Sequence, residues 1–230
     1  MYHIPVMVNE MLALLDVQPN GVYVDATCGG FGHAKTILEK LTSGKLYGFD
    51  QDTDSEKQIP SDERLVFTRK NFKYLKNYLH FYNAVPVDGI FADLGISSFQ
   101  IDTPSKGFSY MFPEEKLDMR MNNDTERTAA DILNFYSEHQ LASIFSNNAQ
   151  IPFARKLSNS IVSIRKETPF QYVGQLNKLL DAFVPEFKRY SYLSRIYQAL
   201  RIEVNNELEV LCEFLTQSIE LTPEMFEKFY

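Results

Sequence analysis

Short apolar runs alternate with amphipathic stretches over the first hundred residues of the chain. Between the runs, His33–Leu41 and Phe72–Tyr82 have the three-to-four-residue apolar spacing of helices. Strand–helix alternation of this kind predicts a parallel sheet with helices on both faces. The apolar runs predict four strands, at Val22–Thr27, Lys45–Asp50, Leu65–Thr68 and Gly89–Leu94.

After Gln100 the pattern becomes helical. A long last helix is predicted from about Tyr190 to Leu221, where apolar residues keep the helical period at Leu200, Val204, Leu208, Leu211 and Leu215. We therefore predict an α/β domain made of residues 1–101 and 197–230, with an inserted helical domain at 102–196. The inserted part has four further helix candidates, Thr128–Tyr136, Glu138–Phe145, Pro152–Arg165 and Tyr172–Phe183, and no convincing strand.

The predicted sheet has few strands for a doubly wound domain. A helix that returns to a parallel sheet normally leads into another strand, but only Thr222-Pro223 and EMFEKFY follow Leu221. We expect the final strands of the sheet to be missing, which would expose a strand edge and apolar surface. Low stability, homo-oligomerisation or a covering partner is the expected consequence.

The composition is that of a globular protein with a core. The chain has 230 residues, of which 44% are hydrophobic, and it lacks the run of about 18 apolar residues that a membrane helix needs. The N-terminus has no signal-peptide pattern. The two cysteines, Cys28 and Cys212, form neither a disulfide framework nor a zinc-binding spacing. We expect a cytoplasmic protein without a membrane partner or a metal.

The charge is distributed unevenly. The chain carries a net charge of −7, but Ile151–Arg201 has nine Lys or Arg against three acids, so this segment is +6 and the remainder −13. A basic segment on an acidic protein suits contact with nucleic-acid phosphates. The same charges also suit solvated helix faces, and both interpretations stay open.

A glycine cluster follows the first predicted strand, in the stretch from Asp25 to His33 (DATCGGFGH). Such a turn lets the backbone approach a ligand. Asp50 ends the next strand, where an acid binds ribose hydroxyls. The dinucleotide pattern G-x-G-x-x-G is not met, because Lys35 occupies the third glycine position. Acids at three strand ends suit the cationic sulfonium of S-adenosylmethionine (SAM), although Asp25 and Asp93 also suit helix capping.

Two aromatic side chains beside this region have alternative interpretations. Phe72 follows the third strand, where it can stack on an adenine or simply begin the apolar stripe of its helix. His33 stands at a helix start, a position that favours a local hydrogen bond over catalysis.

Two polar motifs complete the candidate site. The stretch from Asp93 to Gln100 (DLGISSFQ) lies at the carboxyl end of the fourth strand, where open α/β sheets bind ligands; turn chemistry also explains it. In Leu117–Met121 (LDMRM), Asp118 and Arg120 sit among large apolar residues. They are either substrate contacts or an internal ion pair.

These motifs resemble a known family, the bacterial 16S ribosomal RNA small-subunit methyltransferases H, also called MraW, which methylate the N4 amino group of cytosine. DLGISSFQ and LDMRM are specific to it. The resemblance runs from His3 to about Leu221, through HIPVMVNEML, DATCGGFGH, GFDQD, DLGISSFQID, KGFSY, LDMRM, TAADILN and QALRIEVNNELE.

The resemblance implies a class I SAM-dependent methyltransferase domain of the Rossmann-like type, with SAM as cofactor and a cytidine in the decoding region of 16S rRNA, in the small ribosomal subunit, as substrate. The SAM-binding positions that it implies match Phe31, Gly32, His33, Asp50, Phe72, Asp93 and Gln100.

The chain also departs from the family. Phe31 replaces a glycine, which predicts a bulkier loop beside the cofactor, and the family's G-E-E segment before the helix at Pro152 lacks both acids here. The family's G-G-R-L strand and S-F-H-S-L-E-D-R motif are absent, and the closing EMFEKFY faintly resembles the segment that follows that motif.

For the reaction, we expect Asp93, Ser97 and Ser98 near the transferred methyl group, with Asp118 and Arg120 orienting the base. Three alternatives remain. The chain is an inactive relative that binds SAM or ribosomal RNA without turnover, a nucleotide-binding oxidoreductase, or a defective product without function.

Overall fold

The computed structural model describes residues 5–222, and the chain folds into two compact units. Unit 1 comprises residues up to Gly95 together with those from Leu208 onward, and unit 2 comprises Ile96–Glu207. The domain assignment made from the sequence, which gives the inserted part residues 102–196 and a role in substrate recognition, stays a proposal. The resemblance at His3 and at EMFEKFY, and the expectation about further strands, concern parts of the chain outside the described residues.

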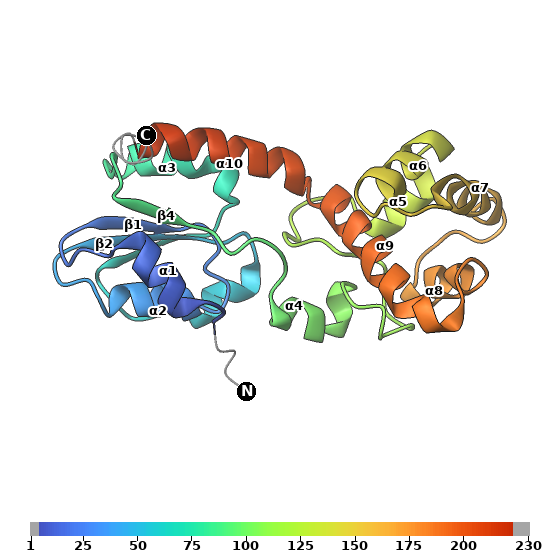
Figure 1. Ribbon diagram of the computed structural model, residues 1–230, viewed down its shortest axis with the longest axis horizontal. Helices are drawn as coiled ribbons and strands as arrows, with labels where there is room; N and C mark the ends of the chain where they lie inside the picture. Colours follow the sequence, from blue (N-terminus) through green and yellow to red (C-terminus); the bar gives the residue numbers. More distant parts are fainter. Residues whose placement is uncertain (1–4, 223–230) are drawn as a thin grey trace. The chain divides into compact units, whose positions relative to one another are not determined.

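Unit 1 contains a parallel four-stranded sheet with the order β3-β2-β1-β4 (Figure 1). The predicted parallel sheet is thereby confirmed, although each of three strands ends one to three residues before the predicted position. Because the strands are parallel, the segments that follow β1, β2 and β4 all leave the same edge. The strands are β1 (Val22–Asp25), β2 (Lys45–Phe49), β3 (Leu65–Thr68) and β4 (Gly89–Phe91).

Helices cover both faces of this sheet, as Figure 1 shows. Successive residues of β1 face opposite ways: Tyr23 packs in one core cluster and Val24 in the other. The Tyr23 cluster includes side chains of α1 (Val8–Leu15) and α2 (Gly32–Leu38), and the Val24 cluster those of α3 (Leu75–Phe81) and α10 (Glu207–Leu221). Two buried faces explain the continuous apolar runs in the sequence.

The last helix of the unit is tied to a segment far away in sequence. Gln217 of α10 donates from Nε2 to the carbonyl of Lys73 at 2.7 Å and accepts at Oε1 from the amide of Lys76 at 2.9 Å. The amide of Val87 donates to the carbonyl of Leu221 at 3.0 Å. These bonds fix α10 against the approach to α3 and to β4.

Unit 2 is helical around one core. Its core residues include Leu117, Met119, Ile132 and Leu157, all with at most 1% exposure. Among the residues the structure describes, its nearest approach to a strand is an isolated bridge between Lys116 and Tyr172. The α-helices are α4 (Ser98–Asp102), α5 (Ala129–Phe135), α6 (Glu138–Asn147), α7 (Ala154–Ile164), α8 (Val173–Asp181) and α9 (Arg189–Val204).

The predicted single helix from Tyr190 to Leu221 is wrong. It is two helices, α9 and α10, separated at Asn205–Asn206, where Asn206 has φ 52°. Two of the apolar residues that kept the helical period, Leu208 and Leu215, are 55% and 53% exposed. At the break, the side chain of Asn205 bonds to the backbone of residues 119 and 121, which holds the chain in place between the two helices.

Four short 3₁₀ helices connect the larger elements: η1 (Thr53–Gln58), η2 (Phe72–Tyr74), η3 (Pro104–Lys106) and η4 (Glu186–Lys188). No helix within residues 5–222 combines the length and apolarity needed to cross a bilayer.

Candidate active site

The loop after β1 is held by backbone bonds to both neighbouring strands. The amide of Ala26 donates to Phe91 of β4 at 2.8 Å, and that of Cys28 donates to Phe49 of β2 at 2.9 Å. Gly29 follows with φ 48°, a left-handed conformation that glycine adopts without cost. The chain therefore turns sharply at the carboxyl ends of the central strands and reaches α2.

Asp25, the last residue of β1, is completely buried. Its Oδ1 accepts the amide hydrogen of Thr27 at 3.0 Å, while its Oδ2 has no hydrogen-bond partner among the described residues. Burial raises the pKa of Asp25 to about 7, and the charges of Asp50 and Asp93 add to the shift. A buried carboxylate with a free oxygen is rare outside functional sites.

Asp50 follows β2 and binds the glycine loop. Its Oδ2 accepts the amide of Gly29 at 2.6 Å and its Oδ1 accepts the amide of Asp52 at 2.8 Å. Burial raises the pKa of Asp50, although these two hydrogen bonds oppose the shift. The acid is thus fixed in orientation beside the loop.

Asp93 lies two residues beyond β4 with its side chain exposed. Its amide donates to Oγ1 of Thr27 at 2.7 Å. Thr27 therefore joins the loop after β1 to the segment after β4, with its amide on Asp25 and its hydroxyl oxygen on Asp93. The three predicted acids gather at one edge of the sheet.

Phe72 begins η2 and is half-buried. Its ring meets that of Phe214 on α10 edge-on, with 5.1 Å between centroids. The preceding Asn71 donates from Nδ2 to Oε1 of Gln51 at 2.9 Å, which connects the ends of β2 and β3. Phe72 is therefore held from behind, with part of its surface still exposed.

The prediction that Phe31 makes the loop bulkier beside the cofactor is wrong, because its side chain points away from the loop surface. Its side chain is fully buried in the core cluster with α2, and its ring meets Phe67 edge-on at 5.2 Å. The residue reaches that position with φ 60°. Only its backbone remains for a ligand. Gly32 is required because of the space around it: a Cβ at this position would lie 2.4 Å from Cγ of Pro5.

His33 is a locally bonded residue. Its Nε2 lies 2.9 Å from the carbonyl oxygen of Val6, its ring packs 4.7 Å from that of Phe91, and it is 8% exposed. The side chain thus ties the segment before α1 to α2 and β4. This matches the local hydrogen bond that its position at a helix start favoured.

The other half of the DLGISSFQ motif belongs to unit 2. Ser97 caps α4: its Oγ accepts the amide of Gln100 at 3.2 Å, and Oε1 of Gln100 accepts the amide of Ser97 at 3.1 Å. Gln100 is 7% exposed, and Ser98 is the half-buried first residue of the helix. The motif accordingly spans both units, with Asp93 in one and its two serines in the other.

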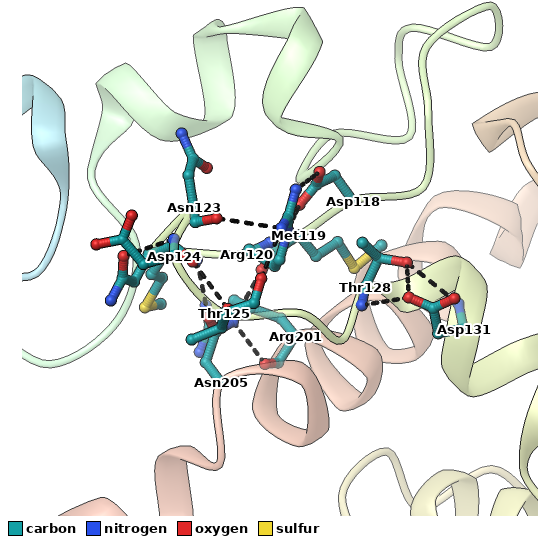
Figure 2. A network of polar contacts seen from close by, with 12 residues as sticks. Asp118, Met119, Arg120, Asn123, Asp124, Thr125, Thr128, Asp131, Arg201 and Asn205 are labelled. Atoms are coloured by element: carbon teal, nitrogen blue, oxygen red, sulfur yellow. Dashed lines mark hydrogen bonds and ion pairs between the residues drawn. The ribbon is translucent and has the colours of Figure 1, made fainter.

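Asp118 and Arg120 form an ion pair in unit 2 (Figure 2). Nε and Nη2 of Arg120 donate to the two carboxylate oxygens of Asp118, each at 2.8 Å. Nη1 donates to the carbonyl of Thr125 at 2.6 Å. Between them, Met119 has φ 64° and accepts at its carbonyl from Asn205, the residue after α9, at 2.8 Å. The pair shapes the loop that binds α9, and the predicted contact with substrate remains a prediction.

Sequence reasoning left out three residues of this site. Thr27, Gln51 and Asn71 connect strand ends, and only the folded structure shows which backbone atoms they meet. Their signal was weak but present: each follows a strand end by two or three residues and carries a polar side chain.

A glycine turn after the first strand, with acids after the first, second and fourth strands of a parallel sheet, defines a Rossmann-like domain of the class I methyltransferase type. The charges fit a cationic nucleoside cofactor, because Asp50 and Asp93 add to the raised pKa of the buried Asp25 and a positive group nearby would relieve that repulsion. The buried Oδ2 of Asp25, which has no hydrogen-bond partner among the described residues, supports the fit between these acids and a cationic cofactor.

Comparison with known proteins agrees with this class. The chain belongs to the MraW methylase family, whose sequence profile matches residues 1–224. Similar proteins named ribosomal RNA small subunit methyltransferase H occur in Parabacteroides distasonis, at 43% identity over 96% of this chain and 72% of the relative, and in Phocaeicola vulgatus, at 46% over 93% and 70%. That of Christiangramia forsetii is 46% identical over 96% of this chain and 73% of its own length.

Proposed function

We propose that this chain transfers a methyl group from SAM to the N4 amino group of a cytidine in the decoding region of 16S rRNA, on the small ribosomal subunit in the cytoplasm. The names of its relatives support ribosomal RNA as the substrate class. The observation that carries the proposal is the group of three acids at the strand ends, one of them buried with a free oxygen.

The glycine loop and the acids would hold the cofactor. Backbone groups of Phe31 and Gly32 border the turn, Asp50 is oriented to accept ribose hydroxyls, and the exposed part of Phe72 offers a face for the adenine. When bound, SAM supplies an electrophilic methyl group on a sulfonium. Gln100 and His33 stay predicted contacts, although both side chains are nearly buried and already bonded.

Asp93 would act on the cytosine amine. The N4 lone pair is delocalised into the ring, so the amine is a poor nucleophile until a hydrogen-bond acceptor draws on its N–H. The exposed carboxylate of Asp93, on a backbone held by Thr27, would be that acceptor. It would take the amine proton as the N–C bond forms and the S–C bond to the methyl group breaks, which would leave a neutral thioether. Ser97 and Ser98 are proposed to position the base after it leaves its stack.

The test measures binding and turnover separately. Calorimetric titration with SAM should show one site, and incubation of small subunits lacking the modification with methyl-labelled SAM should place label on a cytidine N4 of 16S rRNA. Asp93→Ala should abolish the label. Glu39→Ala, which removes an exposed acid elsewhere in unit 1, is the matched control and should leave both measurements unchanged.

Two outcomes would contradict the proposal. Unchanged SAM binding and turnover in Asp93→Ala would remove Asp93 from the mechanism. SAM binding without label on any ribosomal RNA would favour the alternative of an inactive relative, and no SAM binding at all would leave family membership as a record of ancestry.

A further inference from the structure

Unit 2 carries its positive charge unevenly, and the structure separates the cations that are paired from those that are not. Among residues 151–201, four Arg side chains serve internal bonds: Arg189 with Asp181, Arg201 with Glu207, Arg165 with two backbone carbonyls, and Arg195 with the carbonyl of Gln150. Arg155 and Lys156, both exposed, make no hydrogen bond or ion pair with any described residue. They are adjacent, in the first turn of α7.

These two cations border a groove between α6 and α7 with a volume of about 600 Å³. No acidic side chain lines it, although the protein as a whole has a net charge of −7. The nearest acid along α6, Glu138, lies outside the lining and accepts from Asn159. The polar side chains of the lining are His139, Ser143, Ser146, Asn147, Arg155 and Lys156.

A third cation, Arg195, bonds to Gln150, which directly precedes the lining residue Ile151. Arg195 of α9 donates from Nη2 to the carbonyl of Gln150 at 2.6 Å and lies over the ring of Tyr192. That ring packs 5.2 Å from Phe153, which itself lines the groove. Arg195 is thereby fixed beside the groove by a hydrogen bond and by an aromatic support.

The lining selects the chemistry of a ligand. Hydroxyl, amide and imidazole groups beside two unpaired cations, with no acid among them, suit an anion with many acceptor oxygens and an extended shape. A sugar–phosphate backbone has that chemistry. We propose that the groove between α6 and α7 binds the backbone phosphates of the RNA substrate. This inference rests on the proposed function, which supplies the RNA.

The experiment compares two double variants with the same change in net charge. Arg155→Gln/Lys156→Gln removes the groove cations, and Lys166→Gln/Lys178→Gln removes two exposed cations of the same basic segment outside the lining. Binding of each protein to a 16S rRNA fragment is measured from 50 to 300 mM salt, which yields a dissociation constant and a salt slope. SAM titration and thermal unfolding of each variant serve as folding controls.

We expect the groove variant to bind RNA about tenfold more weakly and to lose about 1 to 2 units of salt slope, since two phosphate contacts are removed. SAM affinity should be unchanged. In the methyl-transfer assay on small subunits, KM should rise with kcat retained. The control variant should lose less than a third of these effects.

Three results would overturn the inference. Equal losses in both variants would mean that net charge alone matters. An unchanged salt slope in the groove variant would exclude the groove from the phosphate contacts. Normal RNA binding combined with poor methylation of intact subunits would assign the groove to a ribosomal protein. If the unaltered protein bound no RNA, that result would contradict the proposed function itself, and with it the inference about the groove.

Discussion

Asp25 in unit 1 and Asp118 in unit 2 are carboxylates in opposite situations. Asp118 is partly exposed and has both oxygens bonded by Arg120 in a bidentate pair. Asp25 is completely buried, has one free oxygen and has like charges for neighbours, so its pKa is raised to about 7. The hydrogen bonds of Asp118 are all made within the protein, whereas the buried charge of Asp25 is unfavourable until a ligand pairs with it.

Whether a carboxylate is paired indicates its role, structural or functional, better than its residue type does. A paired charge at a loop stabilises one conformation, while a buried acid without a partner lowers stability and is retained where a ligand uses it. On this comparison we propose that the strand-end acids bind the cofactor and that the ion pair serves the architecture of unit 2. Four variants test the two assignments.

The largest effect is expected from Asp50→Ala. Loss of two charged hydrogen bonds to ribose hydroxyls should weaken SAM binding about a hundredfold. Calorimetric titration measures this, with a melting curve to show that the glycine loop, which also bonds to Asp50, still allows folding. Asp50→Asn keeps one acceptor and should lose less. Equal SAM affinity in all three proteins would remove Asp50 from the site.

The next effect, on stability, is expected from Asp118→Ala. It leaves the guanidinium of Arg120 without its partner and should lower the free energy of unfolding by about 2–3 kcal/mol. Urea denaturation measures this. Asp118→Ala/Arg120→Met, which removes both charges, should recover most of the loss, and SAM affinity should stay unchanged in both.

The same variants test the predicted role in substrate binding. If Asp118→Ala unfolds like the unaltered protein but methylates small subunits poorly, the pair contacts the base and its assignment to architecture is wrong.

How much of this was predictable differs between the units. The parallel sheet and its polar strand ends follow from the sequence, because apolar runs ending in Asp25 and Asp50 have few other interpretations. The buried direction of Phe31 does not, since the positive φ that points its ring into the core is not encoded by hydrophobic periodicity.

Hydrophobic periodicity also could not predict that the last helix is divided into α9 and α10. Leu200, Val204 and Leu208 keep a helical spacing across the break, so periodicity alone favours continuity. The contacts at the break are tertiary: Asn205 exchanges hydrogen bonds with the backbone of Met119 and Met121, which only the folded unit brings near. The bridging role of Thr27 was hidden for the same reason.

A pH-dependent effect on stability is expected from Asp25→Asn. Because the pKa of Asp25 is about 7 in the folded protein and ordinarily 3.8, the folded state binds the extra proton between these values. The free energy of unfolding therefore falls as the pH rises from about 4 to 7, and the cost is complete above 7. Asp50, whose pKa is also raised, acts in the same direction.

Asp25→Asn removes that ionisation. We expect similar stability to the unaltered protein near pH 4.5 and a gain on the order of 2 kcal/mol at pH 8, measured by urea denaturation at both values. SAM binding should weaken, because the free carboxylate oxygen is lost. Greater stability with full SAM affinity would show that Asp25 is not a cofactor contact.

The smallest effect is expected from Thr27→Val, which keeps the shape of the side chain but removes the oxygen that accepts the amide of Asp93. One lost hydrogen bond should cost about 1 kcal/mol of stability, and a less fixed Asp93 should lower kcat up to about tenfold with little change in SAM affinity. Thr27→Ser retains the acceptor and should restore kcat. A drop in SAM affinity without a change in kcat would instead mean that Thr27 supports the glycine loop through Asp25. The arrangement of the site would then depend more on the buried Asp25 than on the exposed Asp93.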